Sequence, residues 1–195
     1  MNTGSAEKTL KEYYTYKDLL NFPENERWEV IDGQIFDMSP APSRRHQEIL
    51  WNLSKLVAAF LEGKQCKAYF APFDVRLPRR NEPDEEIETV VQPDLVVVCD
   101  ETKLDEKGCR GAPDWVVEII SPSTSEKDLI HKKNLYELHK VPEYWVVFPG
   151  DRVVQVFDLN NLEKYVQKRI YIGNAKAPVQ VLPGLIIDLQ KVFQE

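Results

Sequence analysis

The chain has 195 residues, of which 43% are hydrophobic and 29% charged, a balance that is typical of one folded domain and excludes a disordered chain. Its longest apolar run, residues 56–61, is far shorter than the roughly 20 residues that a membrane-spanning helix requires. The net charge of -7 argues against a tight, sequence-independent DNA binder but not against a nuclease, because a metal site is itself acidic.

The N-terminal segment, residues 1–14, is predicted to be flexible, and residues 15–195 are predicted to form a single domain. The polar start of the chain lacks the basic and then apolar pattern of a secretory signal peptide. We therefore expect the protein in the cytoplasm.

Helical and strand patterns alternate in the first third of the chain. The predicted elements are a helix over residues 16–21 with Thr15 as N-cap, hairpin strands over 27–31 and 34–38, and a helix over 43–61. The hairpin is indicated by Asp32-Gly33 between two alternating segments. The longer helix is indicated by apolar residues at helical spacing from Ile49 to Phe60.

Strands dominate the rest of the chain. They are predicted over residues 67–71, 73–77, 90–98, 114–120, 143–148, 152–158, 165–172 and 178–182, with a helical turn over 188–193. Between them, a capping box of Ser123 and Glu126 opens a helix from about Thr124 to Lys140. Since apolar strands flank this helix, it is expected to be the crossover of a βαβ unit in an α/β fold with a mixed sheet.

The cysteines Cys66, Cys99 and Cys109 are odd in number, and no pair shows CxxC spacing. This pattern argues against a disulfide framework and against a zinc ribbon. We expect buried, unreactive thiols.

Two acidic residues interrupt strands that are otherwise apolar: Asp94 in VVQPDLVVV and Glu118 in DWVVEII. A single buried carboxylate is explained by a strand-end hydrogen bond or a nearby lysine. Two carboxylates on adjacent buried strands repel each other, and a divalent cation between them removes both the repulsion and the cost of burial. Oxygen ligands suit Mg²⁺, with Mn²⁺ as a substitute.

A cation is expected beside these acids, to contact the attacking water or the phosphate. Asp128, Lys132, Tyr136 and Lys140 follow one another at intervals of four residues and share one face of the predicted helix. Lys132 is within reach of Glu118 if the helix packs on that strand. The alternative is an ion pair with Asp128, worth roughly a few tenths of a kcal/mol.

Four segments in fixed order, PDLVVV, GAPDWVVEIISPST, DLIHKKNLY and VPEYWVVF, resemble a large family of uncharacterised bacterial proteins described as restriction endonucleases. That family belongs to the PD-(D/E)xK nuclease superfamily. The segments EVIDGQIFDMSPAPSRRHQEI and APFDVRL are similar to it as well, so the resemblance runs from about Tyr16 to the C-terminus. It implies a restriction-endonuclease-like α/β fold, with a mixed sheet flanked by helices and an N-terminal hairpin and helix.

The resemblance also assigns roles in the site. Asp94 matches the Asp of the PD motif and Glu118 matches the (D/E), so both would bind Mg²⁺, with the main-chain carbonyl of Ile119 as a further ligand. The superfamily lysine falls where this chain has Ile120, and Lys132 on the following helix matches a displaced lysine. Asp114 also follows a proline, but it lies four residues before Glu118, about 13 Å away at ~3.3 Å per residue, too far to share one ion.

Further positions are candidates for accessory roles. Glu29 and His46 match family positions, and Glu48 is a further acid near the first long helix; the alternative for Glu29 and His46 is a hydrogen bond between helix and hairpin. Arg44, Arg45, Lys127, Lys132 and Lys133 are candidate phosphate contacts, and a solvated surface is the alternative for them.

The function implied by the resemblance is Mg²⁺-dependent endonucleolytic hydrolysis of DNA phosphodiester bonds, to a 5′-phosphate and a 3′-hydroxyl, by a homodimer without a membrane partner. The alternative is a catalytically inactive nuclease-fold protein that binds or regulates. The acidic net charge favours this alternative. The presence of Asp94, Glu118 and Lys132 together opposes it.

Overall fold

The computed structural model describes residues 11–23, 26–38, 41–121 and 127–194, with side chains described outside 127–129 and 167–168. The upper sheet, in the order β2-β1-β5-β4-β8-β7, comprises β1 (Trp28–Ile31), β2 (Gln34–Asp37), β4 (Val75–Arg76), β5 (Val90–Val91), β7 (Leu104–Asp105) and β8 (Gly108–Arg110). The central sheet, in the order β12-β11-β10-β9-β6-β3, comprises β3 (Lys67–Phe70), β6 (Leu95–Val98), β9 (Trp115–Ile119), β10 (Glu143–Phe148), β11 (Val153–Leu159) and β12 (Tyr165–Ile172).

The remaining elements are short, with one exception. They are the paired strands β13 (Lys176–Pro178) and β14 (Ile186–Asp188), and the helices α1 (Tyr16–Leu19), α2 (Arg44–Leu61), α3 (Lys133–Leu138) and α4 (Leu189–Val192). Short 3-10 turns cover Asp84–Glu86 and Glu101–Lys103. Among the residues described, no helix is both long and apolar enough to cross a membrane.

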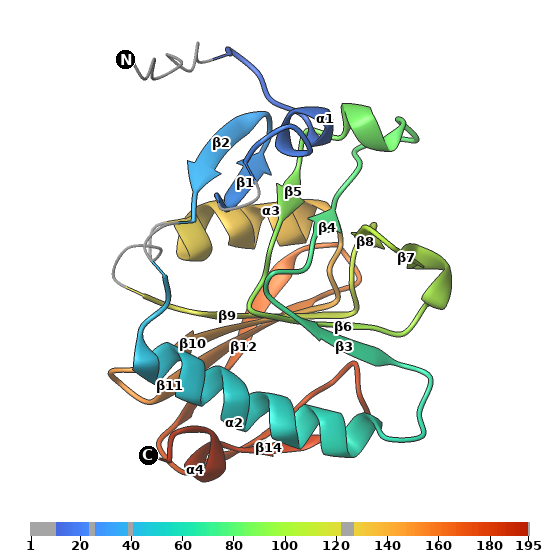
Figure 1. Cartoon of the computed structure of the whole chain (residues 1–195). Helices are drawn as coiled ribbons and strands as arrows, with labels where there is room; N and C mark the ends of the chain where they lie inside the picture. The colour runs from blue at the N-terminus through green and yellow to red at the C-terminus, as the bar shows by residue number, and fades with distance from the viewer. Residues whose placement is uncertain (1–10, 24–25, 39–40, 122–126, 195) are drawn as a thin grey trace, which may run out of the picture.

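The central sheet is the middle layer of the molecule (Figure 1). One core lies between this sheet and α2, with Ile49, Leu53 and Val57 of the helix against Trp115 and Trp145 of the sheet. A second core covers the opposite face of the sheet, where α3 and the upper sheet lie. Because both faces are covered, strands β6 and β9 are buried along their whole length, as their apolar sequence predicts.

Strands β9 and β10 run parallel, and α3 connects them. The predicted βαβ crossover is therefore confirmed. The other pairings of the central sheet are antiparallel, so the sheet is mixed. The predicted α/β fold class is confirmed.

The two predicted hairpins are also confirmed. Strands β1 and β2 are joined by Asp32 and Gly33, which have φ angles of 51° and 76°. This pair of positive angles is what a two-residue hairpin turn requires, and Asp-Gly adopts it at low cost. Strands β10 and β11 pair antiparallel around the second turn.

The strand predicted over residues 90–98 is wrong as a single element. It is divided into β5 in the upper sheet and β6 in the central sheet. Pro93 has no N–H for a strand ladder, and the Gln92 N–H donates to the Glu29 carboxylate instead of to a neighbouring strand. The chain therefore passes from one sheet to the other immediately before Asp94.

The helix predicted over residues 124–140 differs in length and type. A π-helical segment covers Lys127–Lys132, and regular α-helix continues only to Leu138. Lys140 has a φ of 62° and ends the helical path. The predicted capping residues Ser123 and Glu126 lie outside the described part of the chain, as do the side chains of Lys127 and Asp128 and the first ten residues of the predicted flexible segment.

One further predicted strand needs correction, and one hairpin was not predicted. The strand predicted over residues 178–182 continues from β13 only as far as Pro178, because a loop then returns the chain to β14. The β7–β8 hairpin was not predicted. Its Gly108 has a φ of 122°, and a Cβ there would lie 2.2 Å from the Asp74 carbonyl oxygen, so only glycine allows this close approach.

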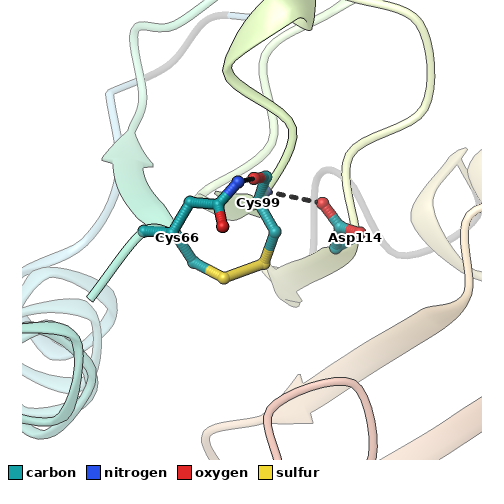
Figure 2. Close-up of a disulfide and its surroundings, with 4 residues drawn as sticks. Cys66, Cys99 and Asp114 are labelled. Atoms are coloured by element: carbon teal, nitrogen blue, oxygen red, sulfur yellow. Dashed lines mark hydrogen bonds between the residues drawn. A yellow bond between two sulfur atoms is a disulfide. The ribbon is translucent and has the colours of Figure 1, made fainter.

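The expectation of three free thiols is wrong for two of them. Cys66 and Cys99 form a disulfide (Figure 2), since they flank the antiparallel pair Lys67 and Val98 of β3 and β6 and therefore face each other. Cys109 is free and buried as expected, and burial raises the pKa of its thiol to about 11.

Candidate metal centre

Asp94 and Glu118 are brought together by the antiparallel pairing of β6 and β9. Leu95 lies opposite Val117, so the residue before β6 meets the last two residues of β9. Alternation along β9 places Glu118 on the same face as Val116, toward α3 and the upper sheet. The two acids predicted from the sequence thus lie at one position in the fold.

Asp94 is held by two groups from other elements. Its Oδ2 accepts the Ile119 N–H at 2.7 Å and lies 3.1 Å from His46 Nε2. His46 sits in the first turn of α2, which Ser43 caps by accepting the His46 N–H. The Asp94 side chain keeps 16% of its surface exposed, so it is the accessible acid of the pair.

Glu118 is almost fully buried, at 3% exposure. Its Oε1 accepts hydrogen bonds from Lys132 Nζ and from the Tyr136 hydroxyl, both at 2.8 Å. Lys132 ends the π-helical segment and Tyr136 lies four residues later in α3, and both side chains extend toward Glu118.

Lys132 contacts a second carboxylate as well. Its Nζ lies 2.8 Å from Glu29 Oε1, and this same oxygen accepts the Gln92 N–H at 2.8 Å. Glu29 comes from β1 of the upper sheet, whereas Glu118 comes from the central sheet. The buried ammonium of Lys132 therefore joins the two sheets through a pair of buried carboxylates.

Tyr136 is the residue of this cluster to which no role was assigned from the sequence. Burial, and then the charge of Glu118, raise the pKa of its phenol well above the ordinary value. The hydroxyl therefore keeps its proton and donates to Glu118. The interval of four residues after Lys132 is the one sequence signal that points to it.

Other candidate residues lie elsewhere. Glu48 pairs with Arg44 at 2.7 Å and approaches Arg45 at 3.7 Å on the outer face of α2. Arg45 also donates to the Phe193 carbonyl at 2.7 Å and so ties α2 to the C-terminal segment. Lys133 lies over the Phe157 ring, 5.3 Å from its centroid.

Asp114, the competing PD aspartate, begins β9 at the end opposite Glu118. Its Oδ2 accepts the Cys99 N–H at 2.7 Å (Figure 2). This contact fits the strand-start role expected for it, away from the other two acids.

The donor atoms around Asp94 and Glu118 suit a hard divalent cation. The carboxylates of Glu29, Asp94 and Glu118 lie in this cluster, and the Lys132 ammonium contacts two of them. The main-chain N–H and C=O of one residue in a β-strand point to the same side of the strand. Because the Ile119 N–H points toward Asp94, the Ile119 carbonyl points to that side as well. Within the described residues, no group of three or more His, Cys, Asp or Glu side chains is arranged to hold a metal. Mg²⁺ can be held by one or two carboxylates with water completing its shell, so Asp94 and Glu118 are the side chains that could hold such an ion.

Comparison with known proteins gives three findings. A solved structure described as a "putative nuclease belonging to DUF820", from Anabaena variabilis, matches with a TM-score of 0.71 at 20% identity, over 92% of this chain and 97% of that one. A protein of Synechocystis sp., slr1290, described as uncharacterized, is 29% identical over 113 residues. That match covers 58% of this chain and 55% of the relative, so the chain spans about half the length of the relative. The Uma2 family, described as "Putative restriction endonuclease", matches residues 10–190. The chain has the restriction-endonuclease-like α/β fold and belongs to the Uma2 family.

Proposed function

We propose that the protein is a Mg²⁺-dependent endonuclease that hydrolyses phosphodiester bonds of DNA, with Asp94 and Glu118 as the metal ligands. The observation that carries this proposal is the meeting of two acids from different strands. Asp94 accepts the N–H of Ile119, the residue next to Glu118. The family of the chain makes a nucleic acid the expected substrate.

Each residue has a defined task in this proposal. Asp94 and Glu118 hold the ion, the Ile119 carbonyl completes the protein's share of the ligands, and His46 orients Asp94. A bound divalent ion would lower the pKa of a water molecule and stabilise the charge that develops on the phosphate. Lys132 fixes the Glu118 carboxylate and supplies the positive charge nearest to it.

Cleavage assays on the variants Asp94→Asn and Glu118→Gln test this proposal. Duplex, single-stranded and branched DNA are incubated with Mg²⁺ or Mn²⁺, and both variants are expected to lose cleavage while keeping the wild-type circular dichroism spectrum. Asp114→Asn is the matched control and is expected to cleave as the wild type does, because Asp114 contacts the Cys99 N–H away from the other two acids. Cleavage retained by either site variant would contradict the assignment.

One observation favours a second candidate function, a nuclease-fold protein that binds nucleic acid without cutting it. Lys132 is only 1% exposed and is paired with Glu29 and Glu118 at the same time, an arrangement that also suits a purely structural ion cluster. Binding of DNA without cleavage in Mn²⁺ by the wild-type protein would support this candidate over the first.

We also propose that the protein acts as a homodimer. Cutting both strands of a duplex in one binding event favours two active centres, and two-fold symmetry supplies them in the simplest way. Sedimentation velocity on the purified chain tests this, since a dimer is expected at micromolar concentration. A monomer at every concentration would contradict it.

A further inference from the structure

A cavity of about 230 Å³ lies between α1, the chain entering β1, and the strand ends at Asp74 and Gln92. Its walls include three aromatic residues, Tyr16, Phe22 and Trp28, and four polar residues, Glu26, Arg27, Asp74 and Gln92. These residues do not belong to the cluster around Asp94 and Glu118.

The aromatic walls favour a flat ligand. The Phe22 and Trp28 rings lie 5.7 Å apart between centroids at an angle of 62°. Aromatic rings bind a planar group by stacking or by edge-to-face contact, and the rings in this wall can supply either contact. Tyr16 is 2% exposed and is fixed in the wall.

The polar groups form one chain of hydrogen bonds across the cavity. Arg27 donates through Nε and Nη2 to Gln92 Oε1 at 3.2 and 2.9 Å, and Gln92 Nε2 donates to Asp74 Oδ1 at 2.9 Å. Burial and the neighbouring Asp74 raise the pKa of Tyr16 to about 12, so its hydroxyl stays protonated beside Asp74. Within the described residues, neither Arg27 nor Asp74 forms an ion pair. The cavity thus offers the Arg27 guanidinium and the Asp74 carboxylate, which Gln92 joins, while the Glu26 carboxylate accepts the Trp28 indole N–H.

The cavity adjoins the proposed metal centre along the chain. Trp28 precedes Glu29, and Gln92 lies two residues before Asp94, a span of about 7 Å in extended chain. The main-chain N–H of Gln92 also bonds to the Glu29 carboxylate at 2.8 Å. A planar group in the cavity therefore lies one short segment from Asp94.

We propose that this cavity binds a single unpaired guanine of the substrate strand beside the bond that is cut. Guanine presents O6 and N7 as acceptors for an arginine and N–H groups as donors for a carboxylate, which matches Arg27 and Asp74. The volume admits one base but not a base pair, so the base enters from a single strand or by flipping out of a duplex. This inference rests on the proposed nuclease function and adds the nature of its substrate to it.

Binding without metal separates the two proposals. Fluorescence anisotropy in EDTA compares an oligothymidylate of about ten nucleotides with the same strand carrying one central guanine. The wild-type protein is expected to bind the guanine strand about tenfold more tightly, the effect of one well-placed pair of base contacts. Asp74→Asn and, independently, Arg27→Met are expected to bring the two affinities together. Asp151→Asn, in the exposed turn between β10 and β11, is the matched control and is expected to keep the preference.

The outcomes distinguish the cavity from the nuclease. Equal affinity of the wild type for both strands, or an unchanged preference in either cavity variant, overturns the inference and leaves the nuclease proposal to the cleavage assay. Failure of the wild type to bind either strand in EDTA likewise overturns the inference alone, because the proposed nuclease contacts phosphate through its metal ion.

Discussion

Lys132 supplies the positive charge between Glu29 and Glu118, with its Nζ at 2.8 Å from each carboxylate. Removing one partner of a buried ion pair leaves an uncompensated charge, which costs about 3–5 kcal/mol. Lys132→Met is therefore expected to lower the free energy of unfolding by that amount in urea titrations. Lys133→Met, which removes a half-buried ammonium above Phe157, is the control and should cost about 1 kcal/mol or less. Equal losses in the two variants would contradict the central place of Lys132.

Tyr136 donates to the same Glu118 oxygen as Lys132 does. Tyr136→Phe removes a buried hydrogen bond to a charged group and is expected to cost about 1.5–3 kcal/mol of stability. It should also weaken Mn²⁺ binding about tenfold, since groups that orient a metal ligand affect affinity on that scale. Tyr165→Phe is the control, because the Tyr165 hydroxyl bonds to the Val141 carbonyl and not to Glu118. Metal affinity unchanged in Tyr136→Phe would exclude this role.

The sequence identified the acids because a carboxylate within a run of β-branched residues is conspicuous. It did not identify Tyr136, since a tyrosine on a helix face more often packs in a core, and nothing local shows that its hydroxyl meets Glu118. It also left Lys132 between two explanations. The contact with Glu29, 103 positions earlier in the chain (132 − 29), depends on how two sheets pack and is not encoded in any local pattern.

At the scale of elements, Glu137 connects the end of α3 to the start of β12. It accepts from Lys164 Nζ at 2.9 Å and from the Tyr165 N–H at 2.6 Å, and these contacts lower its pKa from the ordinary 4.5. Its contribution to stability is therefore present above pH 4.5 and lost as the pH falls through the lower folded-state pKa. Glu137→Gln is expected to cost about 1 kcal/mol at pH 7 and progressively less in acid, measured by urea unfolding across pH. A loss of stability that does not change with pH would contradict this account.

The disulfide between Cys66 and Cys99 is a second link between elements, since it closes a loop over a sequence separation of 33 between β3 and β6. A disulfide that closes a loop of that size stabilises the folded protein by about 3–4 kcal/mol, because it lowers the entropy of the unfolded chain. Dithiothreitol is expected to lower the unfolding free energy of the wild-type protein by a comparable amount and to leave Cys66→Ser unaffected. A wild-type protein indifferent to the reductant would show that the bond does not form in solution.

The regular elements were the predictable ones, because their periodicity is local. The helix over Arg44–Leu61 and both hairpins follow from apolar spacing and from turn residues. The division at Pro93 was missed because residues 90–98 read as one apolar run, whereas the missing N–H and the bond from Gln92 to Glu29 direct the chain into another sheet. The disulfide was missed because its two cysteines meet only through the pairing of β3 and β6.

At the scale of the whole molecule, one cluster joins the upper sheet, the central sheet and α3 through Glu29, Glu118 and Lys132. Asp94 lies beside this cluster, and its side chain is partly exposed. Carboxylates that lie close together at the junction of two sheets repel each other, and a divalent ion would offset that repulsion. The proposed metal centre therefore lies where the two sheets and α3 meet.

The most direct test of the metal centre is a calorimetric titration of Mn²⁺ and then Mg²⁺ into the wild-type protein, Asp94→Asn and Asp114→Asn. We expect the wild type and Asp114→Asn to bind with the same affinity, and Asp94→Asn, in which the remaining carbonyl oxygen can still accept the Ile119 N–H, to lose binding. Equal binding by all three proteins, or no binding by the wild type with or without a DNA oligonucleotide, would contradict the assignment of Asp94 and Glu118 as metal ligands.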